Sequence, residues 1–325
     1  MGVTAVEWRA LVARPPSRLL VQRLAVASLV ANVGIVVTGG AVRLTGSGLG
    51  CPQWPRCSAG SFVVQRSLGI HGAIEFGNRL LTLVLAVVAL ATFAAVVRYR
   101  PAQRSWRRLA GVLLLGIPAQ ALLGGVTVLS ELNPWVVALH LLLSMALIGV
   151  AVALVLAVCR DGQPPLATAG AAPALLVRLT FATTWLVLYA GTVVTGSGPH
   201  AGDRSARRTG LDPAVVSQVH ADLVFLLIGL TAGSLLALRA ARAASAAIRA
   251  AWVLLGVELA QGLVGIVQYV TDLPAVLVGL HLLGAGLVSA SATWLLLSAP
   301  ANARENAPAG KVATSDETCG LPGQP

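Results

Sequence analysis

Eight apolar stretches of roughly 20 residues recur along the chain and constrain its fold more than any other feature. They lie at 20–42, 70–97, 109–129, 135–158, 178–196, 214–238, 250–270 and 276–298. A helix needs about 20 mostly apolar residues to cross the hydrocarbon core of a bilayer. The mean hydropathy of +0.81 is also far above that of a soluble domain. We therefore expect an all-α polytopic membrane protein with eight transmembrane helices.

The first apolar stretch is expected to remain in the protein. Arg14, Arg18 and Arg23 precede or open it, and no small-residue cleavage site follows it. A secretory signal peptide needs such a site after a short apolar core. The stretch at 20–42 therefore predicts a retained first span.

Basic residues are divided unevenly between the two sets of loops that eight spans would place on opposite sides of a membrane. One set holds six of the 23, and Arg79 lies inside a span. The other set holds 16, in the N-terminal segment through Arg23, 98–108, 159–178, 239–249 and the tail. Excess Arg and Lys marks cytoplasmic loops, so we expect both termini in the cytoplasm. The net charge of +11 is then explained better by basic loops that set the membrane topology and lie beside anionic lipid than by nucleic-acid binding.

The composition also indicates a source. Lysine occurs once, at Lys311, against 22 arginines. Chains rich in Arg and Ala are typical of G+C-rich bacterial genomes. The expected location is therefore a bacterial plasma membrane.

The chain contains an internal repeat. The segment at 119–142 matches the segment at 260–283 without a gap, and 11 of the 24 positions are identical. The identities include His140 with His281. Self-similarity on this scale indicates two related halves, and we expect two pseudo-symmetric four-helix bundles.

A second, weaker match extends the repeat. The motif TGSG occurs at 45–48 and again at 195–198. When the two halves are aligned on this motif, His71 falls almost opposite His220. Each half then carries one histidine on its second helix and one on its fourth. The expected organisation is a cytoplasmic N-terminal segment (1–19), a first four-helix half (20–158), a cytoplasmic linker (159–177), a second half (178–298) and a cytoplasmic disordered tail (299–325).

Four of the five histidines lie near the outer ends of the second, fourth, sixth and eighth spans. Ionisable residues inside a membrane are energetically costly and usually mark a functional site. Alternatively, each histidine could be a packing residue that is hydrogen-bonded across helices, but the occurrence of two matched pairs disfavours this interpretation. A metal ion usually takes three or four clustered ligands, and neither half has a third His, Cys or Met at that depth. Haem needs only two axial ligands. We expect one porphyrin in each half, between His71 and His140 and between His220 and His281.

The two halves differ beside their first histidine. In HGAIEFGNRLLT, Glu75, Asn78 and Arg79 follow His71 at i+4, i+7 and i+8, on one face of a helix. A carboxylate one turn deeper than a ligand can act as a general base or stabilise positive charge on a substrate. The alternative is that Glu75 only pairs with Arg79. When His71 is aligned with His220, the second half has apolar residues at the corresponding three positions, namely Val224, Leu227 and Ile228.

Other polar residues each admit two interpretations. Cys51 and Cys57 lie in a loop on the oxidising side, close enough for a disulfide, and reactive thiols in electron or haem transfer are the alternative. Asp222 and Glu258 are either hydrogen-bonded packing residues or proton relays. His200 is either a solvated loop residue or a partner of haem propionates, together with Arg204, Arg207 and Arg208.

The chain resembles the haem A synthases. Four features carry the resemblance: the run GGAVRLTGSGLGCPQWPRC, the opening IEFGNRLLT of the second span, the histidines on spans four, six and eight, and the duplicated halves. It extends from about residue 24 to residue 298. Its most specific part is the first-loop motif with two cysteines followed by a glutamate on the next helix.

The resemblance implies an oxidoreductase that converts a methyl group of haem O to a formyl group through a hydroxylated intermediate, giving haem A for terminal oxidases. Haem O would bind in the first half, with His140 as a ligand and Glu75 as the catalytic residue. A haem b cofactor would lie between His220 and His281. The implied partners are haem O synthase and oxidase assembly factors, and homo-oligomer formation is left open.

One motif departs from the family. Many members carry His followed by Arg three residues after the glutamate, where this chain has Asn78 and Arg79. We therefore expect His71 to replace that ligand, with Asn78 and Arg79 as supporting residues.

Two functions of other classes remain as alternatives. A two-haem electron-transfer cytochrome would also place paired histidines on four helices, and a haem carrier would bind haem O unchanged. Neither needs Glu75 and Arg79 beside one haem only. The sequence leaves open the electron acceptor, the oligomeric state and the route of substrate entry.

Overall fold

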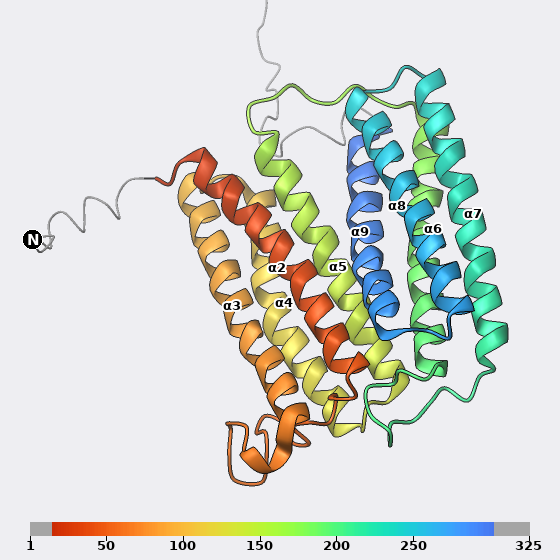
Figure 1. Cartoon of the computed structure of the whole chain (residues 1–325). Helices are drawn as coiled ribbons and strands as arrows, with labels where there is room; N and C mark the ends of the chain where they lie inside the picture. The colour runs from red at the N-terminus through yellow and green to blue at the C-terminus, as the bar shows by residue number, and fades with distance from the viewer. Residues whose placement is uncertain (1–14, 302–325) are drawn as a thin grey trace, which may run out of the picture.

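The computed structural model describes residues 15–301 as a set of long helices (Figure 1). Residues 1–14 and 302–325, which make up most of the predicted N-terminal segment (1–19) and tail (299–325), lie outside the described residues. The short 3-10 helix η1 (Arg66–Leu68) precedes α3. The long helices are α2 (Arg18–Leu44), α3 (Gly69–Tyr99), α4 (Arg104–Leu129), α5 (Pro134–Cys159), α6 (Ala171–Ser197), α7 (Pro213–Ala240), α8 (Ser245–Val270) and α9 (Ala275–Ser298).

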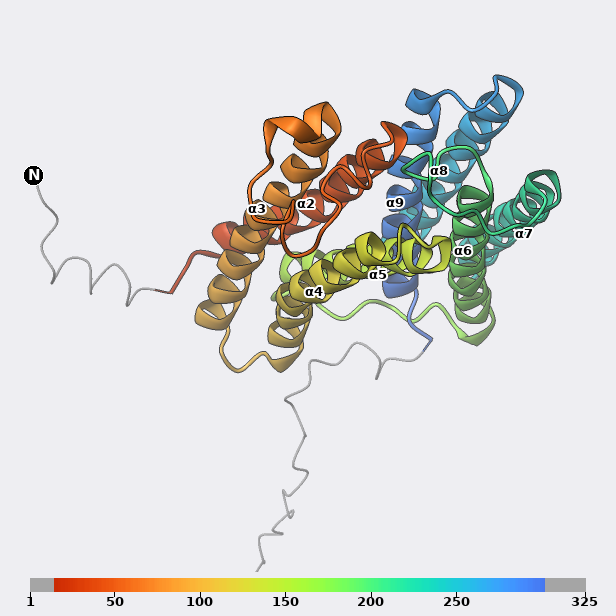
Figure 2. The same cartoon turned by 90° about the horizontal axis from the view of Figure 1, so that it is seen from below.

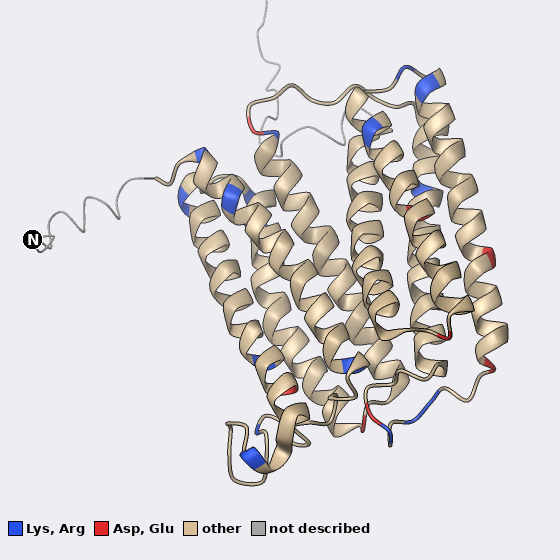
Figure 3. Ribbon diagram, in the orientation of Figure 1, with Lys and Arg blue, Asp and Glu red and all other residues tan. Residues whose placement is uncertain are grey.

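Eight helices within 15–301 are long and apolar enough to cross a membrane, which confirms the predicted number and class. Figure 3 shows charged residues mainly toward the two ends of the helices, with long uncharged stretches between them. Three helices begin five to seven residues earlier than the apolar pattern indicates, at Arg104, Ala171 and Ser245. Apolar runs mark only the part of a helix in hydrocarbon, whereas backbone hydrogen bonding continues into the polar boundary. The predicted linker therefore contributes its last residues to α6.

Local sequence explains where several helices start. Ser17 accepts a hydrogen bond from the Leu20 amide at 3.2 Å and caps α2. Asn133 and Asp212 cap α5 and α7 in the same way, and a proline follows each at the first helical position. A capping side chain satisfies a free amide, and proline has no amide to leave unpaired.

The helices form two groups of four, which we call the first quartet (α2–α5) and the second quartet (α6–α9). In the first quartet the contacts run α2–α3, α3–α4, α4–α5 and α5–α2, which is a closed ring. The second quartet has the same ring in the same order. Viewed along the helices in Figure 2, the quartets stand side by side. They meet through α2 and α5 on one side and α6 and α9 on the other.

The repeat reappears as a repeat of backbone conformation. The α4–α5 turn has positive φ at Glu131 and Leu132 (54° and 60°), and the α8–α9 turn has it at Asp272 and Leu273 (60° and 58°). In each turn the amide of the leucine donates to a carbonyl five residues earlier, at 2.8 and 2.7 Å. Left-handed conformations are uncommon for residues other than glycine, so their occurrence at matched positions is informative. Pseudo-symmetry of the whole quartets stays a prediction.

Hydrogen bonds join the quartets as well as apolar packing. Arg43 at the end of α2 donates to the Thr195 carbonyl at 2.8 Å and to the His200 carbonyl at 2.5 Å. Deeper in the interface the Ser289 hydroxyl donates to the Met145 carbonyl at 3.0 Å. These bonds fix the outer ends of the two quartets relative to each other, where the predicted site residues lie.

Candidate functional site

The second quartet brings two predicted ligands together. His220 on α7 and His281 on α9 face each other with ring centroids 6.5 Å apart and planes at 72°. Helices α7 and α9 do not contact each other, because they stand at opposite corners of the ring. The two imidazoles therefore meet in the interior of the quartet, as expected from the sequence.

Their spacing fits a metal centre held by two imidazoles. Two metal–nitrogen bonds of about 2 Å, with about 1 Å more from each nitrogen to its ring centre, place the ring centres about 6 Å apart. The Nδ1 atom of His281 is buried without a hydrogen-bond partner within residues 15–301. A buried polar atom of this kind normally has a partner. The described part of the chain contains no cluster of three or more His, Cys, Asp or Glu suited to a metal ion. Haem needs two axial ligands, which these two imidazoles could supply.

Both rings of this pair lie against glycines of neighbouring helices. A Cβ placed on Gly191 of α6 would lie 3.1 Å from His220 Cε1, and one placed on Gly265 of α8 would lie 3.4 Å from His281 Cε1. The absence of a side chain lets each imidazole lie close to the next helix. The glycines thus leave the room that the rings occupy.

His140 in the first quartet has the same surroundings as His281. Its Nδ1 is buried without a partner within the described residues. Its ring lies against Gly124 of α4, and its carbonyl accepts a hydrogen bond from Gln120 at 3.2 Å. The matching bond in the second quartet, from Gln261 to the His281 carbonyl, is 2.7 Å long. His140 is therefore prepared for a ligand in the same way.

His71 differs from the other three. It is exposed at the first turn of α3, and its Nδ1 lies 2.9 Å from the Ser47 hydroxyl. It also lies near Asp203 of the outer loop; hydrogen bonds from Ser205, and to a lesser extent the charge of His71, lower the pKa of that carboxyl. No ring contact joins His71 to His140 anywhere in residues 15–301, unlike the pair in the second quartet.

Glu75 lies at the centre of a buried polar cluster. It is only 6% exposed, and its carboxylate accepts hydrogen bonds from the Cys51 amide at 2.6 Å and from Arg79 at 2.5 Å. Arg79 also donates to the carbonyls of Cys51, Gln53 and Arg56 at 3.0 to 3.4 Å. The ion pair considered in the sequence analysis is thus present, and it holds the first outer loop.

That loop, residues 45–65, covers the outer end of the first quartet. A disulfide joins Cys51 to Cys57, as predicted. Trp54 between them packs on Gly125 of α4, next to Gly124, which contacts His140. The second quartet has Ile266 at the position that corresponds to Gly125, and this residue is exposed. The first quartet alone therefore has a loop seated on this glycine.

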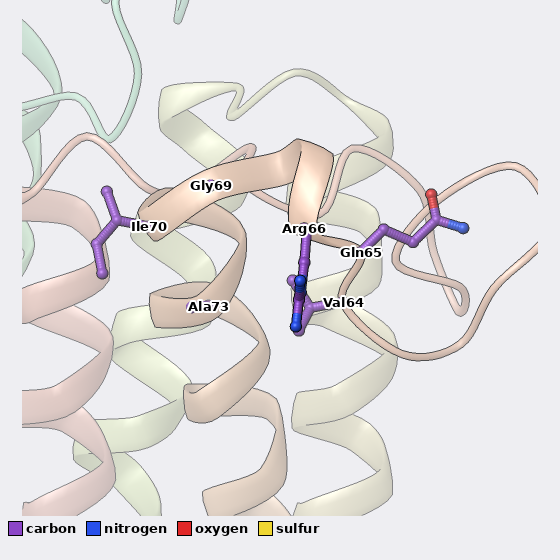
Figure 4. A pocket seen from close by; sticks show the side chains of 6 residues that line it. All are labelled: Val64, Gln65, Arg66, Gly69, Ile70 and Ala73. Carbon is purple, nitrogen blue, oxygen red and sulfur yellow. The ribbon is translucent and has the colours of Figure 1, made fainter.

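A cavity of about 400 Å³ opens where the loop enters α3 (Figure 4). Its lining comes from one short stretch: Val64, Gln65, Arg66, Gly69, Ile70 and Ala73. Figure 4 shows the side chain of Gln65 pointing away from those of Val64 and Arg66. Neither Glu75 nor any histidine lines this cavity, so it is separate from the residues discussed above.

Asn78 and the remaining acids also have defined partners. Thr38 of α2 donates to Asn78 Oδ1 at 2.8 Å. Asp222 accepts from Gln218 at 2.8 Å on an exposed surface, which favours the packing interpretation. Glu258 is buried and accepts from Thr231 at 2.9 Å, whereas its other oxygen has no partner within residues 15–301.

His200 is not the solvated residue considered from the sequence. Its Nε2 lies 2.9 Å from the Leu273 carbonyl, and its own carbonyl accepts from Arg43. It therefore joins the outer loop to the α8–α9 turn. The arginines named with it show no common site, since Arg208 donates to carbonyls of its own loop.

The sequence analysis missed the residues that position the rings. Gln120, Gly124, Gln261 and Gly265 were not singled out. They are nevertheless among the identical positions of the repeat at 119–142 and 260–283, and that identity was the available signal. Thr38 and Gly191 had no such signal.

The chain is similar in sequence to known proteins. Residues 22–68 and 67–202 match the model of a family described as "Cytochrome oxidase assembly protein". The chain is 31% identical over 137 residues to a protein named "Heme A synthase" from Geobacillus thermodenitrificans, which covers 42% of each chain. It is 31% identical over 148 residues to a "Heme A synthase" from Geobacillus kaustophilus (strain HTA426), covering 44% of this chain and 45% of the relative. The matched stretch spans less than half the length of these relatives. Because the family match covers more than half of this chain, the protein belongs to the cytochrome oxidase assembly protein family.

Proposed function

We propose that this protein is a haem A synthase, which oxidises a methyl group of haem O to a formyl group through a hydroxylated intermediate. Both steps are two-electron oxidations, so the protein must hold a porphyrin firmly and pass electrons onward. The names of the two relatives support the proposal. So does the difference between the quartets, since only one combines a histidine prepared for a ligand with a buried ion pair.

Each quartet has its own role in this proposal. The second quartet holds haem b between His220 and His281, and this group supplies one-electron transfer when bound. The first quartet holds the substrate haem O through His140. The further prediction that His71 is a second ligand would use its Nε2, because its Nδ1 is bonded to the Ser47 hydroxyl.

The observation that carries the proposal is the buried Glu75–Arg79 ion pair of the first quartet, because the buried acid of the second quartet, Glu258, bonds only to the Thr231 hydroxyl within residues 15–301. The described residues contain two ion pairs, Glu75–Arg79 and the more exposed Arg100–Asp161 at the opposite end of the helices. Oxidation of a methyl group draws electrons from carbon and builds positive charge there. A carboxylate in a site of low dielectric constant stabilises such charge strongly. Arg79 would keep this carboxylate oriented.

The experiment that tests the proposal is pigment analysis. The full chain is expressed beside a source of haem O, and the haems of the purified protein and of the membrane are extracted. Formyl haem supports the synthase. Unchanged haem O would overturn it in favour of a carrier, and haem b alone in both quartets would favour the electron-transfer cytochrome.

We also propose a location and an orientation. The protein would lie in a bacterial plasma membrane with both termini in the cytoplasm, because the α3–α4, α5–α6 and α7–α8 ends (98–108, 159–178 and 239–249) carry ten arginines, against six in the loops at the opposite end. A reporter inserted after Gln163 should be cytoplasmic, and one inserted after Arg204 should be external. The reverse result would overturn the orientation. Haem O synthase and oxidase assembly factors are the proposed partners.

A further inference from the structure

The glycine contacts of the histidines follow one rule in both quartets. His140 of α5 lies on Gly124 of α4, His220 of α7 on Gly191 of α6, and His281 of α9 on Gly265 of α8. Each imidazole thus rests on the helix that comes just before its own helix in the chain. The rule predicts a fourth position, where a residue of α3 rests on a glycine of α2.

Asn78 occupies this fourth position. A Cβ placed on Gly39 of α2 would lie 4.0 Å from Asn78 Nδ2. Gly39 is five residues before the end of α2 at Leu44, and Gly191 is six residues before the end of α6 at Ser197. The two glycines therefore have nearly the same place in their helices.

The depth of Asn78 agrees with that of His220. Asn78 lies 21 residues before the end of α3 at Tyr99, and His220 lies 20 residues before the end of α7 at Ala240. His71 lies seven residues before Asn78, which is about 10 Å farther toward the outer end at 1.5 Å per residue. By position in the helix, Asn78 and not His71 is the counterpart of His220.

The amide of Asn78 is oriented as a donor. The Thr38 hydroxyl lies 2.8 Å from its Oδ1 and 3.2 Å from the Ile35 carbonyl, so its hydrogen has Oδ1 as the nearer acceptor, whereas Nδ2 has no hydrogen-bond partner within the described residues. A neutral carboxamide nitrogen carries two hydrogens and has no lone pair to offer a metal comparable to that of imidazole. Asn78 can therefore donate a hydrogen bond toward the bundle interior but cannot replace a histidine ligand.

From these observations we infer that the iron of the substrate haem is held by one protein imidazole, that of His140, and that its opposite face is open toward Asn78. The Nδ2 amide then serves as a hydrogen-bond donor to a small ligand on the iron, such as water, dioxygen or carbon monoxide. This inference rests on the proposed function, because it assumes a porphyrin in the first quartet. In this arrangement Asn78 is a positioning residue, and His71 is not a ligand but is hydrogen-bonded to Ser47 of the outer loop.

Carbon monoxide binding tests the inference without measuring turnover. The full chain is purified after expression beside a haem O source, reduced, and exposed to carbon monoxide. We expect one of the two haems to bind it, while the haem between His220 and His281 stays silent because both axial positions are filled. Asn78→His should abolish the response by supplying a second imidazole. His71→Ala should leave it unchanged.

A second measurement guards against a variant that does not fold. Asn78→Ala should retain carbon monoxide binding but shift the C–O stretching frequency, because the amide donor is lost. An unshifted frequency would overturn the role of the amide. Two haems that are both silent in the unchanged protein would overturn the open face, and a response gained only in His71→Ala would identify His71 as the ligand.

The same experiments distinguish a failure of the proposed synthase function from a failure of the inference about the open face of the iron. Carbon monoxide binding with unchanged haem O in the extract would support the open face and overturn the synthase. A preparation whose only haem disappears in His220→Ala would overturn both, since the first quartet would then hold none.

Discussion

His220 and His281 lie 6.5 Å apart between ring centroids, although the helices that carry them do not contact each other. Only side chains that reach into the interior of the quartet can meet in this way. We expect His220→Ala and His281→Ala each to remove a low-spin haem signal, because one imidazole cannot fill both axial positions. Electron paramagnetic resonance with haem quantitation measures this.

The matched control for these variants is His200→Ala. His200 lies in the outer loop and bonds the Leu273 carbonyl, so its loss should leave the low-spin signal in place. A spectrum that stays unchanged in both His220→Ala and His281→Ala would contradict the assignment.

Gly191→Ala tests whether the glycine contact fixes the ligand. The added methyl group would lie 3.1 Å from His220 Cε1, closer than ordinary contact, so the ring must move. Overpacking of this kind costs about 1–3 kcal/mol. We expect a lower haem content and a lower temperature of haem loss, measured by absorbance during heating.

Gly256→Ala on α8 is the control for that experiment, because nothing lies within 4 Å of its added methyl group. Equal haem loss in the two variants would mean that helix propensity, and not contact with the ring, governs binding.

Glu75→Gln tests the catalytic role. Glutamine keeps the size and can still accept from the Cys51 amide, but it removes the charge beside Arg79. We expect both haems to remain bound while the formation of formyl haem falls by about 10²-fold, the usual effect of losing one electrostatic stabiliser. Pigment extracts should contain haem O or its hydroxylated product.

Glu258→Gln, at the buried acid of the second quartet, is the matched control and should still give haem A. If Glu75→Gln made haem A at the normal rate, Glu75 would only anchor the outer loop.

Arg79→Lys tests how the outer loop is held. A single ammonium group cannot donate at once to Glu75 and to the three loop carbonyls that Arg79 reaches. We expect faster limited proteolysis within residues 51–66, with haem b retained in the second quartet. Arg66→Lys, at the cavity of Figure 4, should leave the cleavage rate unchanged. Equal rates in Arg79→Lys and the unchanged protein would exclude Arg79 as the anchor.

The fold was predictable because each span carries its own signal. Apolar length located every helix, and errors fell where polar boundary turns extend α4, α6 and α8 beyond hydrocarbon. The match of His281 with His140 followed from the repeat, since the α4–α5 and α8–α9 connections have the same length in the two quartets. His220 was found because it is the one histidine of α7.

The first site was less predictable for a geometric reason. The connection between α2 and α3 is longer than that between α6 and α7, so an offset taken from the TGSG motif sets His71 against His220. Counting from the helix ends instead sets Asn78 there. The polar atoms that meet in the first quartet depend on the offset that aligns α3 with α7. This offset can be found only when the ends of the helices are known. The bonds from Arg79 to loop carbonyls were equally out of reach, because backbone atoms carry no sequence signal.

The closed ring of α2 to α5 also has a consequence for biosynthesis. All four contacts of that ring use segments that are synthesised before α6. Units that close on themselves generally fold as they emerge, the N-terminal one first. The first quartet can therefore assemble in the membrane while the second is still being translated, with α5 facing lipid until α6 and α9 cover it and α2 facing lipid until α9 arrives. A porphyrin delivered during translation would find the site of His140 complete before the partner site exists.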